Sequence, residues 1–303
     1  MSKLPAESDG EALRQRIAEL ESELARFRTW RAPGDFYSPI PDVAEVEAKA
    51  DTLFDTTLRN LPGIESRVPE QVALAEAFLA YYADQPWNAE GRPDRRYRFE
   101  NDQFSYSDAL FLYFMMRHVK PRRILEVGSG HSSAAMLDTD DLFLGSTVEF
   151  TFIDPYPERL LSVLRPADRE RVRILDVPVQ DVPLEEFDRL EADDILFIDS
   201  THVSKTGSDV NRLAFEVLPR LAKGVYVHVH DIHYPFEYPR EWVMEGRAWN
   251  EAYLLRAFLQ FNSAYEIVVM NTALERYREA WFREHMPLCL KNSGGSLWLR
   301  RRN

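Results

Sequence analysis

The segment from Arg123 to Ser133 constrains the fold more than any other stretch of this chain. An apolar run there ends in Gly128-Ser129-Gly130 and continues into small residues. This pattern predicts a buried parallel strand, a tight turn and the start of a helix, where the backbone approaches a ligand closely. We therefore expect an α/β fold with a nucleotide or nucleoside site at the turn.

Two acidic residues indicate which ligand this turn suits. Glu126 precedes the first glycine by two residues, so its carboxylate is placed to hold an ammonium group. Asp154 ends the next apolar run, and a carboxylate at the tip of a second strand suits both hydroxyls of a ribose. Ser133 stands where a dinucleotide fingerprint has its third glycine, which disfavours a pyrophosphate ligand. An amino acid joined to a ribose without phosphate describes S-adenosylmethionine.

Four acid-bearing strand ends make the chain resemble a known family. The segments are Glu126–Gly130, Phe152–Asp154, Ile195–Asp199 and Val227–Asp231. They are similar to those of the class I S-adenosylmethionine-dependent methyltransferases, over roughly the C-terminal two thirds of the chain. The resemblance implies a Rossmann-like, doubly wound seven-stranded sheet within residues 106–303, mostly parallel with an antiparallel late strand.

Hydrophobic patterns predict the remaining elements. The expected strands are 123–127, 148–153, 172–175, 194–199, 224–231, 265–270 and 296–300. A helix is expected to begin near Ser107, with that side chain as its N-cap, and an amphipathic helix over 249–261. Further upstream, the apolar spacing predicts helical structure from 43 to 84.

The resemblance also implies the cofactor site. The residues expected to bind the cofactor are Glu126, Gly128, Ser129, Gly130, Ser132, Ser133, Asp154, Gln180, Asp181 and Asp199. Small side chains and backbone N–H groups at the start of a helix suit the methionine carboxylate. Gln180 or Asp181, after the third strand, is placed to contact the adenine, although turn chemistry explains an aspartate there nearly as well.

Catalytic candidates lie at the ends of the fourth and fifth strands. The run Asp199-Ser200-Thr201-His202 resembles the Asp-x-x-His segment of small-molecule methyltransferases that are similar to macrolide sugar methyltransferases and cephalosporin hydroxylase-like proteins. Either His202 or His230 takes a hydroxyl proton as a general base, with Asp199 beside them, or Asp199 and Asp231 bind Mg²⁺. Ile232 stands where catechol-type relatives have a second Asn or Asp, which favours the metal-free base, with His202 first and His230 second.

The N-terminal third divides into two predicted regions. Residues 1–30 contain an amphipathic helix over 11–28, suited to oligomerisation or to a solvated surface. Residues 31–105 form a region of helices and loops expected to cover the acceptor site. The aromatic residues expected to contact the acceptor are Tyr37, Tyr234, Tyr238 and Trp242.

Charge and cysteine content narrow the partners and the location. The net charge of −13 argues against nucleic acid, so a small-molecule or saccharide acceptor is expected. Cys289 is the only cysteine, which excludes an intramolecular disulfide. Because no secretory signal or membrane-length apolar run is visible, we expect a cytoplasmic protein without membrane insertion.

Together these observations predict a methyltransferase (EC 2.1.1.-) that methylates a hydroxyl group in a bacterial biosynthetic pathway. An N-methyl acceptor is compatible with the same sequence. The alternatives are an oxygenase-like or NAD-dependent enzyme on the same fold, or a non-catalytic cofactor-binding scaffold. Ser133 and Glu126 argue against NAD, and intact acids at all four strand ends argue against a degenerate site.

Overall fold

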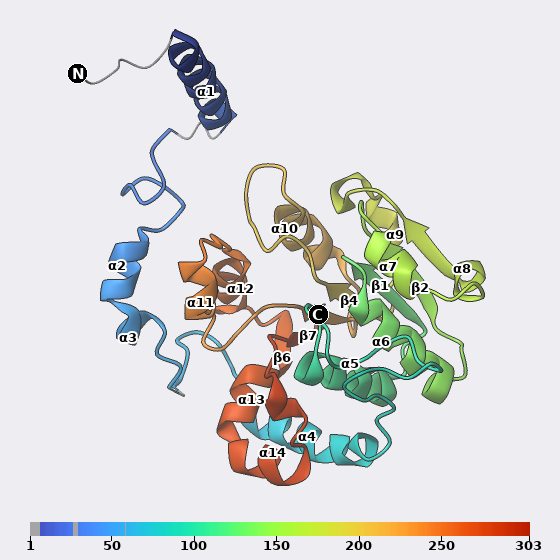
Figure 1. Ribbon diagram of the computed structural model, residues 1–303. Coiled ribbons are helices and arrows are strands. Elements are labelled where there is room, and N and C mark those ends of the chain that lie inside the picture. Colours follow the sequence, from blue (N-terminus) through green and yellow to red (C-terminus); the bar gives the residue numbers. More distant parts are fainter. Residues whose placement is uncertain (1–6, 27–29, 58) are drawn as a thin grey trace.

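A seven-stranded sheet forms the centre of the molecule (Figure 1). The computed structural model describes residues 7–26, 30–57 and 59–303. Its strands are β1 (Arg123–Val127), β2 (Glu149–Ile153), β3 (Val172–Leu175), β4 (Ile195–Ile198), β5 (Tyr226–Val229), β6 (Tyr265–Met270) and β7 (Leu297–Arg301). They are ordered β3-β2-β1-β4-β5-β7-β6; the first five are parallel, and β7 runs antiparallel to both of its neighbours. The predicted fold class is confirmed.

Helices cover both faces of this sheet. The helices of the described chain are α1 (Glu7–Arg26), α2 (Val43–Ala48), α3 (Ala50–Leu53), α4 (Val68–Tyr82), α5 (Tyr106–Val119), α6 (His131–Thr139), α7 (Glu158–Val163), α8 (Asp168–Arg171), α9 (Leu184–Asp188), α10 (Asp209–Arg212), α11 (Arg240–Met244), α12 (Glu251–Leu259), α13 (Asn271–Tyr277) and α14 (Glu279–His285), of which α1 to α3 lie away from the sheet. Alternating strand residues enter two cores. Ile124 and Phe197 pack with α4, α5, α6 and α14, whereas Leu125 and Leu196 pack with α9 and α12.

The prediction of helical structure from 43 to 84 is wrong over its middle part. Short helices α2 and α3 end by Leu53, and α4 begins only at Val68. Pro62 lacks an N–H donor and Gly63 has a φ of +77°, so the chain turns between these helices. Pro69 sits in the first turn of α4, where a missing N–H costs nothing.

The predicted N-cap of α5 is also wrong. The helix begins at Tyr106, and the Ser107 hydroxyl donates a hydrogen bond to the Glu275 carboxylate. Because Glu275 lies on α13, far along the chain, local capping rules gave no sign of this partner. By contrast, the Ser208 hydroxyl does cap α10, accepting a hydrogen bond from the Asn211 N–H.

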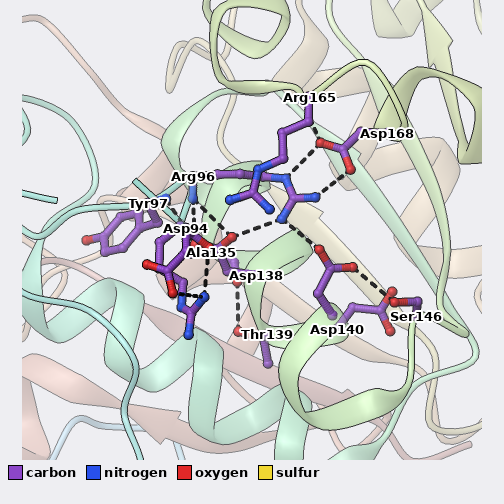
Figure 2. Close-up of polar contacts among 12 residues, drawn as sticks. Asp94, Arg96, Tyr97, Ala135, Asp138, Thr139, Asp140, Ser146, Arg165 and Asp168 are labelled. Atoms are coloured by element: carbon purple, nitrogen blue, oxygen red, sulfur yellow. Dashed lines mark hydrogen bonds and ion pairs between the residues drawn. The ribbon is translucent and has the colours of Figure 1, made fainter. Parts of the chain in front are cut away.

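The segment before α5 is held in place by a buried guanidinium group. Figure 2 shows Arg96 between Asp138 at the end of α6 and Asp168 at the start of α8. Its Nη1 lies 3.0 Å from Asp138 Oδ1, and its Nε donates to Asp168 Oδ2 at 2.7 Å. The three side chains are at most 4% exposed. These contacts fix the loop that carries Tyr97 and Phe104 into the same core as the sheet.

Helix α1 stands apart from the rest of the molecule (Figure 1). The last two residues of the predicted helix, 27 and 28, lie outside the described part of the chain. Within that part, no helix is long and apolar enough to cross a membrane.

The turn after β1 requires glycine at position 128. Gly128 has a φ of +79°, and a Cβ atom there would lie 1.8 Å from the carbonyl oxygen of Asp199. We expect Gly128→Ala to lower the free energy of unfolding by about 3 kcal/mol, because backbone strain and a clash with rigid backbone add together. Urea denaturation followed by circular dichroism measures this loss.

Gly246 provides a matched control for this substitution. It also has a positive φ, +91°, but a Cβ atom there meets nothing within 4 Å. Gly246→Ala should therefore lower the free energy of unfolding by only about 1 kcal/mol, the cost of the backbone strain. Equal losses in the two variants would contradict the role of the close approach to Asp199.

Candidate active site

A cavity of about 660 Å³ opens at the carboxyl ends of β1, β2 and β4. This is the edge of an open parallel sheet where ligands bind. Of the residues expected to bind the cofactor, it is lined by Gly128, Ser129, Asp154, Gln180 and Asp199. Its volume is in the range of small-molecule sites.

The floor of the cavity is the glycine turn, which Asp154 fixes. One carboxylate oxygen, Oδ2, accepts hydrogen bonds from both the backbone N–H and the hydroxyl of Ser129, each at 2.9 Å. The other, Oδ1, accepts from the Tyr156 N–H at 2.8 Å. The Gly128 N–H donates to the Ile153 carbonyl at 2.9 Å, which joins the turn to the end of β2. Asp154 thus orients the turn and lines the cavity as well.

Glu126 lies beneath the turn and does not line the cavity. It is fully buried, and its two carboxylate oxygens accept hydrogen bonds from the hydroxyls of Ser132 and Ser133. Burial raises the pKa of Glu126 to about 8. The Ser133 hydroxyl also accepts from the Gly130 N–H at 2.9 Å. These residues connect β1 to the first turn of α6.

The two candidates after β3 are separated by the structure. Gln180 lines the cavity, and its Nε2 donates to the Gly207 carbonyl at 3.0 Å. Asp181 is exposed and lies outside the cavity wall. Of the pair, only Gln180 can reach a ligand in this cavity without rearrangement.

Two histidines and two aspartates meet at the inner end of the cavity. His202 Nε2 lies 3.5 Å from Asp199 Oδ1 and 3.5 Å from Asp231 Oδ2. His230 Nδ1 lies 3.3 Å from Asp199 Oδ1 and 3.7 Å from Asp231 Oδ1. The strand-end candidates His202, His230, Asp199 and Asp231 therefore form one cluster, as the sheet topology predicted.

A second carboxylate lies behind each histidine. His202 Nδ1 is 2.9 Å from Glu251 Oε2, and His230 Nε2 is 3.3 Å from Asp108 Oδ2. Asp108 is in turn held by the Ser296 hydroxyl at 2.7 Å. Sequence reasoning missed Glu251 and Asp108, which lie on α12 and α5. Their only sequence signal is an acid at the first helical turn, which is common.

The surrounding carboxylates favour the charged form of both histidines. Burial opposes a charge on His202, but hydrogen bonds with Asp199 and Glu251 raise its pKa to about 10. Burial likewise opposes a charge on His230, but Asp231, Asp199 and Asp108 raise its pKa well above the usual value. Burial raises the pKa of Asp199 less than the two histidines lower it, so this carboxyl stays ionised. His202 is therefore an imidazolium ion at neutral pH, and the pKa of His230 is shifted in the same direction.

His228 lies on the same face of β5 as His230, two residues earlier in the strand, and is fully buried. Its Nε2 lies 2.9 Å from the Ser296 hydroxyl, and its ring stacks on Phe197 with centroids 3.9 Å apart. Burial lowers the pKa of His228 well below its usual value.

Asp199 and Asp231, the residues expected to bind Mg²⁺, lie beside the imidazolium group of His202. Asp199 and Asp231 each have an oxygen 3.5 Å from His202 Nε2, so the imidazolium lies between them. Among the described residues, no group of three or more His, Cys, Asp or Glu side chains has the arrangement of a metal site.

The four aromatic candidates do not gather at this cavity. Tyr37 is 63% exposed. Tyr234 and Tyr238 are buried and line a separate cavity of about 460 Å³. Trp242 lines a third cavity, of about 320 Å³. The indole that does line the main cavity is Trp249, whose ring lies 4.4 Å from that of His202.

The third cavity adjoins the main one across the histidine cluster. Both cavities are lined by Gln103, His230 and Asp231. On its far side the third cavity is lined by Trp242 and by His233, whose Nε2 is buried without a hydrogen-bond partner. His230 and Asp231 thus stand where the two cavities meet.

Fold and cavity together are those of an α/β protein with a ligand-sized cavity at the carboxyl ends of its parallel strands. Residues 125–232 match the profile of a family described as a methyltransferase domain. An uncharacterised protein of Archaeoglobus fulgidus is 35% identical over 164 residues, which are 52% of this chain and 73% of that protein. The chain belongs to this family of methyltransferase-domain proteins.

Solved structures with a similar fold are more distant. The methyltransferase PaMTH1 of Podospora anserina, bound to S-adenosylhomocysteine, is 15% identical, with a TM-score of 0.44 over 88% of this chain and 99% of that one. The O-methyltransferase TomG of Streptomyces achromogenes, in complex with S-adenosylmethionine, is also 15% identical, with a TM-score of 0.43 over 86% and 96%. The assignment rests on the sequence family and on the site described above.

Proposed function

We propose that this methyltransferase transfers the methyl group of S-adenosylmethionine to a hydroxyl group of a small-molecule acceptor. The observation that carries the proposal is the cluster of His202, His230, Asp199 and Asp231, which lines the cofactor-sized cavity and whose members His230 and Asp231 also line a second cavity. The bound cofactor supplies an electrophilic methyl group. The protein has only to align the two reactants and accept a proton.

The cavity residues fit this cofactor. The Asp154 carboxylate, at the tip of β2, is suited to hydroxyl groups of a ribose, and Gln180 offers an amide near the end of β3. Asp199 and Asp231 add negative charge at the inner end, which favours a sulfonium ion. Glu126, Ser132 and Ser133 support the turn from below, so we assign them an indirect role.

We assign the role of proton acceptor to His202, with His230 as the second candidate. Glu251 binds the Nδ1 side of His202, so the Nε2 atom faces the cavity. This imidazole must first lose its own proton. A bound sulfonium ion favours that loss, because a nearby positive charge lowers the pKa of a histidine.

The acceptor site that the geometry supports is the third cavity. Among the described residues lining it there is no lysine or arginine, whereas Asp102, Asp108 and Asp231 are present. An anionic acceptor is therefore disfavoured, and an uncharged hydroxylated one fits. Trp242 supplies an aromatic wall there. With the net charge of −13, these features argue against nucleic acid as the acceptor.

Two further points belong to this proposal. A cytoplasmic location is supported by Cys289, the only cysteine, which is buried as a free thiol.

A mechanism that uses Mg²⁺ bound by Asp199 and Asp231 is the second candidate. Each of these carboxylates has an oxygen 3.5 Å from His202 Nε2, so the two lie close enough to share one ion.

Calorimetric titration of the EDTA-treated protein with S-adenosylhomocysteine tests the cofactor site. We expect binding to the wild type, and about 10- to 100-fold weaker binding to Asp154→Asn, because a hydrogen bond to a charged acceptor is lost. The matched control is Asp181→Asn, which changes an exposed carboxyl outside the cavity and should bind like the wild type.

The outcomes of this titration separate the mechanisms. No binding to the wild type would overturn the proposed function. Mg²⁺ that binds the wild type but not Asp231→Asn would replace the metal-free base by the metal mechanism. Cofactor binding without a heat of Mg²⁺ binding supports His202 as the proton acceptor.

A further inference from the structure

Helix α1 carries an apolar stripe that the rest of the described chain leaves uncovered. Four side chains are 41–69% exposed to solvent: Leu13, Ile17, Leu20 and Leu24. Their spacing of four, three and four residues is that of alternating d and a positions in a coiled coil. Figure 1 shows α1 away from the sheet and its helices, so no other residue in the described part of the chain covers this stripe.

The charges beside this stripe indicate what covers it. If Ile17 and Leu24 are a positions, the flanking e and g positions hold Arg14 and Arg16 in the first half and Glu21 and Glu23 in the second. All four belong to the stretch 11–24 of α1, in which every residue is exposed. We call the face of α1 that carries the apolar stripe and these flanking charges the seam. Its N-terminal half is therefore basic and its C-terminal half is acidic.

This separation of charge makes the helix complementary to itself. In a parallel pair, Arg16 of one copy faces Glu21 of the second copy, because g and following e positions meet. In an antiparallel pair, Arg14 faces Glu21 and Arg16 faces Glu23. Opposite charges meet in both directions, and Ile at an a position with Leu at d positions favours two strands.

A lipid surface fits α1 less well than a second copy does. The helix contains six acidic residues and three arginines, so an anionic membrane repels it. We propose that two copies of this chain associate through their α1 helices as a two-stranded coiled coil, independently of the proposed activity. Because α1 is short, the coiled coil should be only weakly stable. The dimer should therefore dissociate into monomers at low protein concentration.

Sedimentation equilibrium of the full chain, between about 1 and 100 µM, tests this proposal. We expect the wild type to reach twice the monomer mass within this range. Leu20→Asp, which places a carboxylate in the seam, should weaken association about 100-fold and leave a monomer. The matched control is Ala18→Asp, on the same helix but outside the seam, which should associate like the wild type.

Charge reversal tests the complementarity separately. The variant R14E/R16E makes both halves acidic, so its association should weaken at least about tenfold and recover partly at high salt. Adding E21R/E23R restores opposite charges and should restore association. A wild type that stays monomeric, or a Leu20→Asp variant that dimerises like the wild type, would overturn the proposal. Circular dichroism confirms that each variant keeps the folded sheet domain.

Discussion

Replacing Arg96 by leucine is expected to lower the free energy of unfolding by about 3–5 kcal/mol. The substitution removes the cation that neutralises Asp138 and Asp168, whose side chains are 1% and 2% exposed. Asp138 keeps its hydrogen bonds from the Trp87 indole at 3.0 Å and the Tyr97 N–H at 3.0 Å, but Asp168 loses a two-point partner. The loss arises because Asp138 would lose the guanidinium of Arg96 and Asp168 would keep only the more distant Arg171 Nε, 3.6 Å away (Figure 2).

Urea denaturation at neutral pH measures this effect, and Arg92 provides its control. Arg92 also pairs with an aspartate, Asp94, but the two side chains are 50% and 54% exposed. Arg92→Leu should therefore cost less than about 1 kcal/mol, because water screens the pair. If both variants lost the same stability, the buried ion pairs of Arg96 would not be what fixes this segment.

Replacing His202 by alanine is expected to lower kcat by about 10²- to 10⁴-fold, the usual contribution of a general base. The rate is measured as the formation of S-adenosylhomocysteine with an acceptor that supports turnover. Binding of S-adenosylhomocysteine should change little, since His202 acts on the acceptor hydroxyl. A variant that loses cofactor binding in parallel with kcat would show that His202 holds the cofactor instead.

The pH dependence of kcat/KM identifies the proton acceptor. Because the pKa of His202 is raised to about 10, the neutral, active form increases from pH 7 toward pH 10, and the rate should rise with it. Glu251→Gln removes a charge that stabilises the imidazolium, so the rise should move to lower pH. Glu245→Gln, which changes a carboxylate on the surface, is the control.

The ¹⁵N chemical shifts of the histidines test the same point without an acceptor. In the cofactor-free wild type, His202 should stay protonated well above pH 7, and in Glu251→Gln it should lose its proton at a lower pH. A His202 that is neutral at pH 7 in the wild type would contradict the charge arrangement of the site.

Local sequence patterns were sufficient to predict the sheet. The strands expected at 172–175 and 265–270 are observed with the same bounds as β3 and β6. The turn at Gly128 could be predicted because its signal is local. An apolar run, a glycine and the start of a helix follow one another directly in the sequence. The prediction of helical structure from 43 to 84 was wrong in its middle part because it used apolar spacing alone and did not take into account the turn at Pro62 and Gly63.

The partners within the site lie far apart in sequence. Glu251 follows His202 by 49 residues, and Asp108 precedes His230 by 122. Neither acid differs in its local sequence from an ordinary residue at the start of a helix. Trp249 was overlooked for the same reason, because nothing near it in sequence shows that it packs on His202.

The sequence by itself determined the parallel strands, the glycine turn and which acids and histidines stand at the strand ends, because strand period and turn chemistry are local properties. Only the tertiary structure decided how those groups are charged. The proton on His202 depends on Asp199 and Glu251 being close in a buried place, where opposite charges are screened little by water. Which side chains share that place is set by how helices such as α5 and α12 pack on the sheet.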